Sequence, residues 1–241
     1  MNIRFGFSTG CFYKSPLGVR ERLALIGDAQ CSAVELGFVK LESFEAGADE
    51  LLRSDFVADA FGPRFDYISL HAPVFNYGAN EETERIFELI RKLNQKILLD
   101  SVVFHPDTVT DFEVFKYAGF GVAFENMDNR KAAYKTPEEF EHIFEKNENL
   151  SIVLDANHIY TNNPSMALAA QFLEKFRDRI VEVHMSGYAG YHEPLFKMPA
   201  EQKKIIKAIQ GLRVPIIVES VLAPEELAQE RDYILEVLGS P

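Results

Sequence analysis

Short runs of apolar residues recur along the chain and alternate with segments whose apolar residues are spaced as on one helix face. The run at residues 151–155 places Ile152, Val153 and Leu154 together, a composition typical of a strand buried on both faces. The segment 81–99 repeats isoleucine or leucine at positions i, i+4, i+7 and i+11, which indicates an amphipathic helix. The pattern therefore predicts that strands and helices alternate.

Eight strands are expected, at residues 3–9, 32–38, 66–71, 101–105, 121–126, 151–155, 179–184 and 214–220. Helices are expected at residues 16–29, 49–61, 81–99, 111–117 and 199–209, and three more are expected to begin at Thr136, Asn163 and Pro224. The strands repeat about every 30 residues, the period of a parallel barrel. We therefore predict the α/β class, with a single (β/α)8 TIM-barrel domain over residues 1–241. An open doubly wound sheet is the alternative.

Six expected strands end in residue types that ligate metals, namely His71, His105, Glu125, Asp155, His184 and Glu219. Aspartate and glutamate (37) plus histidine (6) make 43 of the 241 residues, so this run of strand ends would be rare by chance. The carboxyl ends of barrel strands form one mouth, where all six side chains are expected to converge. An open sheet would bring together only the residues near its switch point.

Further residues near the expected mouth have two interpretations each. His158 follows Asp155 by three residues, where a loop is expected to turn it back toward the same point. Glu35, in the middle of the second strand, either reaches the mouth or pairs with a neighbour, and pairing is favoured. The loop tyrosines line a pocket or pack ordinarily; they are Tyr77, Tyr188 and Tyr191.

The composition narrows the class of protein. The 25 basic and 37 acidic residues give a net charge of −12, which argues against nucleic-acid and anionic-membrane partners because phosphate affinity comes mainly from lysine and arginine. We find no signal-peptide core and no run approaching 18 apolar residues, so a cytoplasmic protein with a small-molecule substrate is expected. Cys11 and Cys31 are too few for a disulfide framework.

The motifs at the strand ends and in the following loops are LHAP, FHP, FEN, LDxxH, HMSG, HEPL and VES. With these motifs the whole chain resembles the xylose-isomerase-like TIM-barrel superfamily. That superfamily contains sugar and sugar-phosphate isomerases and epimerases, and also the zinc apurinic-site endonucleases of the endonuclease IV type (AP endonuclease family 2).

The resemblance implies roles for the strand-end residues. The four that match the ligands of one divalent cation in the isomerases and epimerases are Glu125, Asp155, His184 and Glu219. In those enzymes the two glutamates also act as acid and base on opposite faces of the substrate. His71 and His105 match the endonuclease ligands of an additional zinc that would share Glu125.

His158 and His192 match two ligands of a third endonuclease zinc. The chain departs from the pattern at Gly190, where the endonucleases have the aspartate that completes the third site. It also lacks the arginine that many epimerases carry after the seventh strand, since Lys197 is the one cation there. Substrate-binding or third-metal candidates are His158, His192, Asn126 and Lys197.

Three carboxylates and one histidine suit Mn²⁺, Mg²⁺, Co²⁺ or Zn²⁺, and added histidines favour Zn²⁺, so Zn²⁺ or Mn²⁺ is the expected cofactor. The expected function is a metal-dependent sugar or sugar-phosphate isomerase or epimerase with Glu125 and Glu219 as acid and base. One alternative is a zinc phosphodiesterase that acts on abasic DNA or another phosphodiester. A second is a non-catalytic metal or small-molecule binding barrel. The oligomeric state is left open.

Overall fold

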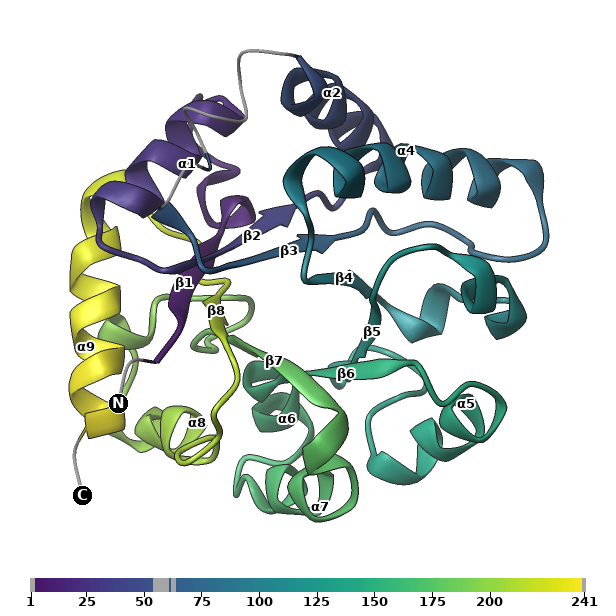
Figure 1. Ribbon diagram of the computed structural model, residues 1–241. Helices are drawn as coiled ribbons and strands as arrows, with labels where there is room; N and C mark the ends of the chain where they lie inside the picture. The colour runs from purple at the N-terminus through teal and green to yellow at the C-terminus, as the bar shows by residue number, and fades with distance from the viewer. Residues whose placement is uncertain (1–2, 54–60, 62–63, 240–241) are drawn as a thin grey trace.

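The computed structural model describes residues 3–53, 61 and 64–239 of the chain. Its strands form a closed parallel barrel in sequence order, with β1 also paired to β8 (Figure 1). The strands are β1 Phe5–Ser8, β2 Ala33–Gly37, β3 Tyr67–His71, β4 Ser101–Phe104, β5 Val122–Glu125, β6 Ser151–Asp155, β7 Ile180–Met185 and β8 Ile216–Val218. The prediction of a single-domain (β/α)8 barrel is confirmed.

Helices surround the barrel on its outside (Figure 1). The α-helices are α1 Val19–Asp28, α2 Leu41–Leu52, α4 Glu81–Ile97, α5 Glu141–Lys146, α6 Ala156–Asn162, α7 Ala167–Phe176, α8 Lys203–Lys207 and α9 Leu227–Gly239. Short 3-10 helices join them: η1 Thr9–Phe12, η3 Pro106–Thr108, η4 Phe112–Tyr117, η5 Pro137–Phe140, η6 Arg177–Arg179, η7 Leu195–Lys197, η8 Ala200–Gln202 and η9 Pro224–Glu226.

Helix α4 follows from its local sequence. The Asn80 side chain accepts a hydrogen bond of 2.8 Å from the Thr83 N–H and so caps the helix, and three glutamates in the first turn face the positive end of the helix dipole. The helix ends at Leu98, which has a left-handed backbone (φ 60°). Its predicted apolar face is buried against the barrel.

Other helices differ from the prediction. The second was expected at residues 49–61, part of which lies outside the described residues, but α2 begins at Leu41 because the buried Phe44, Ala48 and Leu51 already repeat at helical spacing. A loop was expected after β6, yet α6 begins there directly. The helix expected from Asn163 begins only at Ala167.

The two remaining short helices are less regular than expected. Residues 112–117 form the 3-10 helix η4, and the segment expected as one helix over 199–209 divides into η8 and α8. Neither difference moves a strand end, so the mouth of the barrel is unaffected.

The barrel interior positions the polar side chains. Strand residues alternate between the helical layer and the inside, where small apolar groups such as Val103, Ala123 and Val153 pack together. The register between β6 and β7 shifts after Ile152, so that Asp155 pairs with His184. Ligand-type residues thereby occupy the end of the interior above this apolar layer.

Candidate metal centre

The structure brings all six strand-end side chains to one mouth. Two groups have ligand atoms that lie within 4.8 Å of one another and share Glu125. The first group consists of Glu125, Asp155, His184 and Glu219, and the second of His71, His105 and Glu125.

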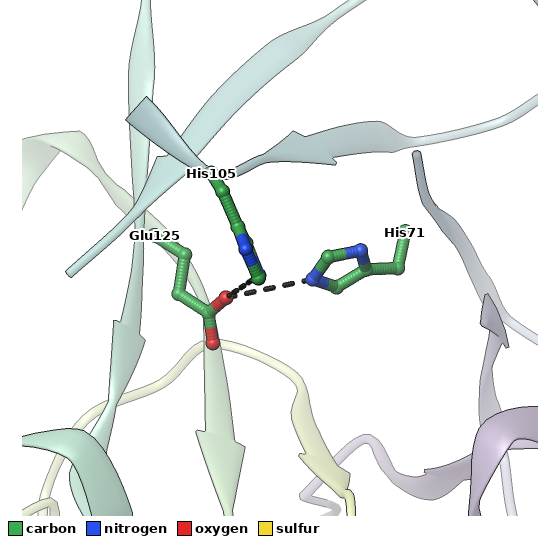
Figure 2. Close-up of side chains that lie close together, drawn as sticks. All are labelled: His71, His105 and Glu125. Carbon is green, nitrogen blue, oxygen red and sulfur yellow. Dashed lines mark hydrogen bonds and ion pairs between the residues drawn. The ribbon is translucent and has the colours of Figure 1, made fainter. Parts of the chain in front are cut away.

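Glu125, on β5, connects the two groups. Its Oε2 lies 3.1 Å from His105 Nε2 and 3.5 Å from His71 Nε2, and its Oε1 lies 3.0 Å from His184 Nδ1. Figure 2 shows His71 and His105 directed toward the same carboxylate oxygen. Because β3, β4 and β5 are adjacent, their three strand ends meet without any long loop.

Asp155 uses its two carboxylate oxygens differently. Oδ1 accepts a 2.7 Å hydrogen bond from the His158 N–H and caps α6, whereas Oδ2 is buried without a hydrogen-bond partner. The Asn126 side chain accepts from the Asp155 N–H and donates to the Asp155 carbonyl, which fixes the strand end. His105 Nδ1 is also buried and unpartnered. Buried polar atoms normally have partners, so the unpartnered Asp155 Oδ2 and the mixed oxygen and nitrogen donor set fit a divalent cation.

Charge is distributed unevenly over the carboxylates. Burial and the nearby negative charges of Glu35 and Glu125 raise the pKa of Glu219 to about 8. The positive charge of His184 offsets these effects only in part. Burial likewise raises the pKa of Asp155 to about 6. Burial also opposes ionisation of Glu125, but the surrounding histidines outweigh it and hold the Glu125 pKa well below its usual value.

Two buried glutamates lie beneath His184, which is held between them and the mouth. His184 Nε2 lies 3.1 Å from both Glu35 Oε2 and Glu182 Oε1, and Glu182 accepts hydrogen bonds from Tyr67 and Ser69. Together with His184, Glu35 and Glu182 form a third group of ligand types. Glu35 therefore pairs with a neighbour as the sequence favoured, and the carboxylates orient Nδ1 of His184 toward Glu125.

Sequence reasoning overlooked Glu182, although one signal was available. It precedes His184 by two residues, and side chains two apart on a strand point to the same face.

His158 and His192 line the same cavity as the ligand groups. His158 Nδ1 lies 2.7 Å from the Asn126 carbonyl oxygen, 3.6 Å from Asp155 Oδ2 and 3.7 Å from Glu125 Oε1. His192 Nδ1 lies 3.0 Å from Ser186 Oγ and 3.9 Å from Glu219 Oε2. Both histidines therefore lie beside the first ligand group. Lys197 pairs with Glu226, the last residue of η9, and does not line the cavity.

A cavity of about 770 Å³ opens above the ligand groups. It receives basic side chains from loops that the sequence analysis did not consider, notably Arg130 and Lys131 after β5. Arg130 Nε donates to Asp128 Oδ2 at 2.9 Å. Of the loop tyrosines, Tyr191 lines the cavity, whereas Tyr77 is buried and donates its hydroxyl to the Pro73 carbonyl.

The described helices include none that is both long enough and apolar enough to traverse a lipid bilayer.

No family model and no curated protein matches the chain. Several solved structures do match the chain. A xylose isomerase domain containing protein from Salmonella typhimurium has a TM-score of 0.71 at 14% identity, with 100% of both chains covered. An AP endonuclease, family 2, from Brucella melitensis has a TM-score of 0.71 at 16% identity, covering 96% of this chain and 99% of the other. A D-psicose 3-epimerase crystallised with D-fructose has a TM-score of 0.69 at 10% identity, covering 99% and 100%. The chain therefore shares the (β/α)8-barrel fold of these proteins.

Proposed function

We propose that the protein is a divalent-metal-dependent isomerase or epimerase of a sugar, a sugar phosphate or a related polyol. The observation that carries the proposal is the first ligand group, in which Glu125 and Glu219 belong to one set with Asp155 and His184 below the cavity. Glu219 lines the cavity and its side chain is 18% exposed, whereas that of Glu125 is 1% exposed.

The group suits proton transfer beside a carbonyl. A divalent cation held by the first ligand group would polarise a substrate oxygen and acidify the neighbouring C–H. Glu219, which lines the cavity, can then accept or return the carbon-bound proton as a general base. Glu125 comes from a strand three places away in the barrel, so the two carboxylates approach a substrate from different sides.

The comparisons agree with this class without choosing within it. One neighbour acts on a ketose, as its name states, and another is an endonuclease. The net charge of −12 favours a small-molecule substrate over a polyanion such as DNA.

The test follows exchange of solvent deuterium into a panel of ketoses by the Mn²⁺- or Zn²⁺-loaded protein. We expect exchange that disappears in Glu219→Gln and after treatment with a chelator. The metal content of Glu219→Gln is measured in parallel, to separate loss of the base from loss of the cation. Absence of exchange with every ketose would contradict the proposal.

The second ligand group favours one other candidate. His71, His105 and Glu125 could hold another cation beside the first, the arrangement of a two-metal phosphodiesterase. Cleavage of an abasic-site duplex at low and moderate salt, with two or more bound Zn²⁺ and no deuterium exchange, would favour that candidate.

A further inference from the structure

Exposed apolar side chains gather at the cavity. Over the described residues, eight large apolar side chains are exposed, and four of these line the cavity. These four are Tyr13 (54% exposed), Val39 (66%), Val74 (43%) and Tyr191 (47%). Exposed apolar side chains gathered at a concave site indicate a ligand.

The apolar side chains have a common origin in the barrel. Tyr13, Val39 and Val74 follow β1, β2 and β3, and Leu17 joins them from the turn before α1. We call these four residues the apolar lobe. The first ligand group comes instead from β5 to β8, so the cavity has a ligating half and an apolar half.

The apolar half also carries polar side chains at its edges, among them Arg22, Lys40, Ser43 and Glu50. Arg22 donates to the carbonyls of Leu17 and Thr9, and the Ser43 hydroxyl donates to the carbonyl of Lys40, which ties both side chains to their own loops. The three aliphatic side chains of the apolar lobe offer no hydrogen-bond partner to the hydroxyl groups of a free sugar. The cavity volume of about 770 Å³ also suits a ligand of drug size.

We propose that the substrate has two chemically different parts: a hydroxylated part that reaches the ligand groups, and a flat apolar part, such as the aromatic ring of an aryl glycoside, that lies on the apolar lobe. The hydroxylated part rests on the proposed function, whereas the apolar part rests on the lobe alone. Tyr13 and Tyr191 both line the cavity and are exposed there, and aromatic rings so placed can contact such a group.

The test compares methyl and 4-nitrophenyl glycosides matched in their sugar, by calorimetry on the Zn²⁺-loaded protein. We expect the aryl glycosides to bind roughly tenfold more tightly, as stacking and burial of one ring would give. Val39→Asp and Tyr13→Ala should each reduce this preference to about threefold or less. The matched controls are Leu98→Asp and Tyr117→Ala, because both positions are exposed but lie outside the cavity.

Three results would overturn the inference: equal affinity for both glycosides, binding of neither, or an aryl preference that Val39→Asp leaves intact. A dimer in sedimentation that Val39→Asp dissociates would overturn it too, in favour of a protein partner. Deuterium exchange by the wild type, measured beside the glycoside affinities, separates the two proposals. An aryl preference without deuterium exchange in the wild type would contradict only the proposed function, whereas exchange without an aryl preference would contradict only this inference.

Discussion

Asp155 shows how one side chain combines a structural and a ligating role. Asp155→Asn should keep the cap of α6, because an amide oxygen can still accept from the His158 N–H, but it replaces the unpartnered anionic oxygen with a poor ligand. We expect metal affinity, measured by competition with a chromophoric chelator, to fall by about 100-fold or more, with under about 1 kcal/mol of change in the metal-free unfolding free energy.

Asp100→Asn provides the matched control for Asp155→Asn. Asp100 precedes β4 at the opposite end of the barrel, where its carboxylate accepts from the Ile68 N–H. This variant should keep full metal affinity. Retention of wild-type affinity by Asp155→Asn would remove Asp155 from the ligand set.

Substitution of His105 tests whether this residue is a metal ligand or a core histidine. Its Nδ1 has no partner and its Nε2 contacts Glu125, so removing the ring breaks few protein contacts. His105→Ala should lower the metal affinity or stoichiometry, with a loss of about 1 kcal/mol in the unfolding free energy of the metal-free protein. Elemental analysis and urea titration check both values. A variant that unfolds while its metal stoichiometry stays intact would identify His105 as structural.

At the scale of elements, α9 supports the last strand end through Glu230. This buried carboxylate accepts hydrogen bonds from the Leu195 and Phe196 N–H groups and from the Ser220 hydroxyl, beside Glu219. Glu230→Ala leaves three donors without their acceptor, and we expect a loss of about 3 kcal/mol in unfolding free energy. Gln229→Ala, an exposed neighbour on α9, should change it little. A loss below about 1 kcal/mol for Glu230→Ala would show that water replaces the carboxylate.

The strand ends were predictable because a buried parallel strand carries a continuous apolar run, and the polar residue that stops the run marks the mouth. Helix α6 was not predictable from the sequence, because it has only seven residues. Its start depends on the Asp155 side chain, which caps the helix, and not on a periodic spacing of apolar residues. Glu182 was missed because its place beside Glu35 depends on barrel closure and on the register shift after Ile152.

The cavity walls were the least predictable part of the site. Arg130 and the apolar lobe lie on loops, whose composition does not reveal which strand ends they cover. The sequence offered Lys197, after the seventh strand, as the basic side chain of the site. In the structure the cavity is lined instead by Arg130, which follows β5. Only the closed barrel brings that loop beside the residues that follow β7.

At the scale of the whole molecule, a cluster of carboxylates lies where a cation would bind. Five buried or partly buried carboxylates gather at or below the mouth, and they are Glu35, Glu125, Asp155, Glu182 and Glu219. Histidines balance part of this charge. The hydrogen bond to Glu125 and the charges of Glu35, Glu125 and Glu219 outweigh the burial that opposes a charge on His71, and its pKa is raised from 6.5 to about 9.

The stability of the metal-free protein should therefore depend on pH with a definite sign. A folded-state pKa raised above the unfolded value gives stability that is fully present below the unfolded pKa and lost as pH rises through the folded one. For His71 this loss runs from 6.5 to about 9, and for Glu219 from 4.5 to about 8. Between pH 6.5 and about 8 both contributions decline, and from about 8 to about 9 the His71 contribution declines further, so the chelator-treated protein should lose Tm over this window. Metal binding needs the deprotonated ligands, so stabilisation by stoichiometric Zn²⁺ or Mn²⁺ should grow over the same window. Scanning calorimetry at several pH values measures both, and His71→Gln should flatten the upper part of the metal-free slope. A gap between loaded and chelator-treated protein that stays constant with pH would show that these groups release no protons to the metal.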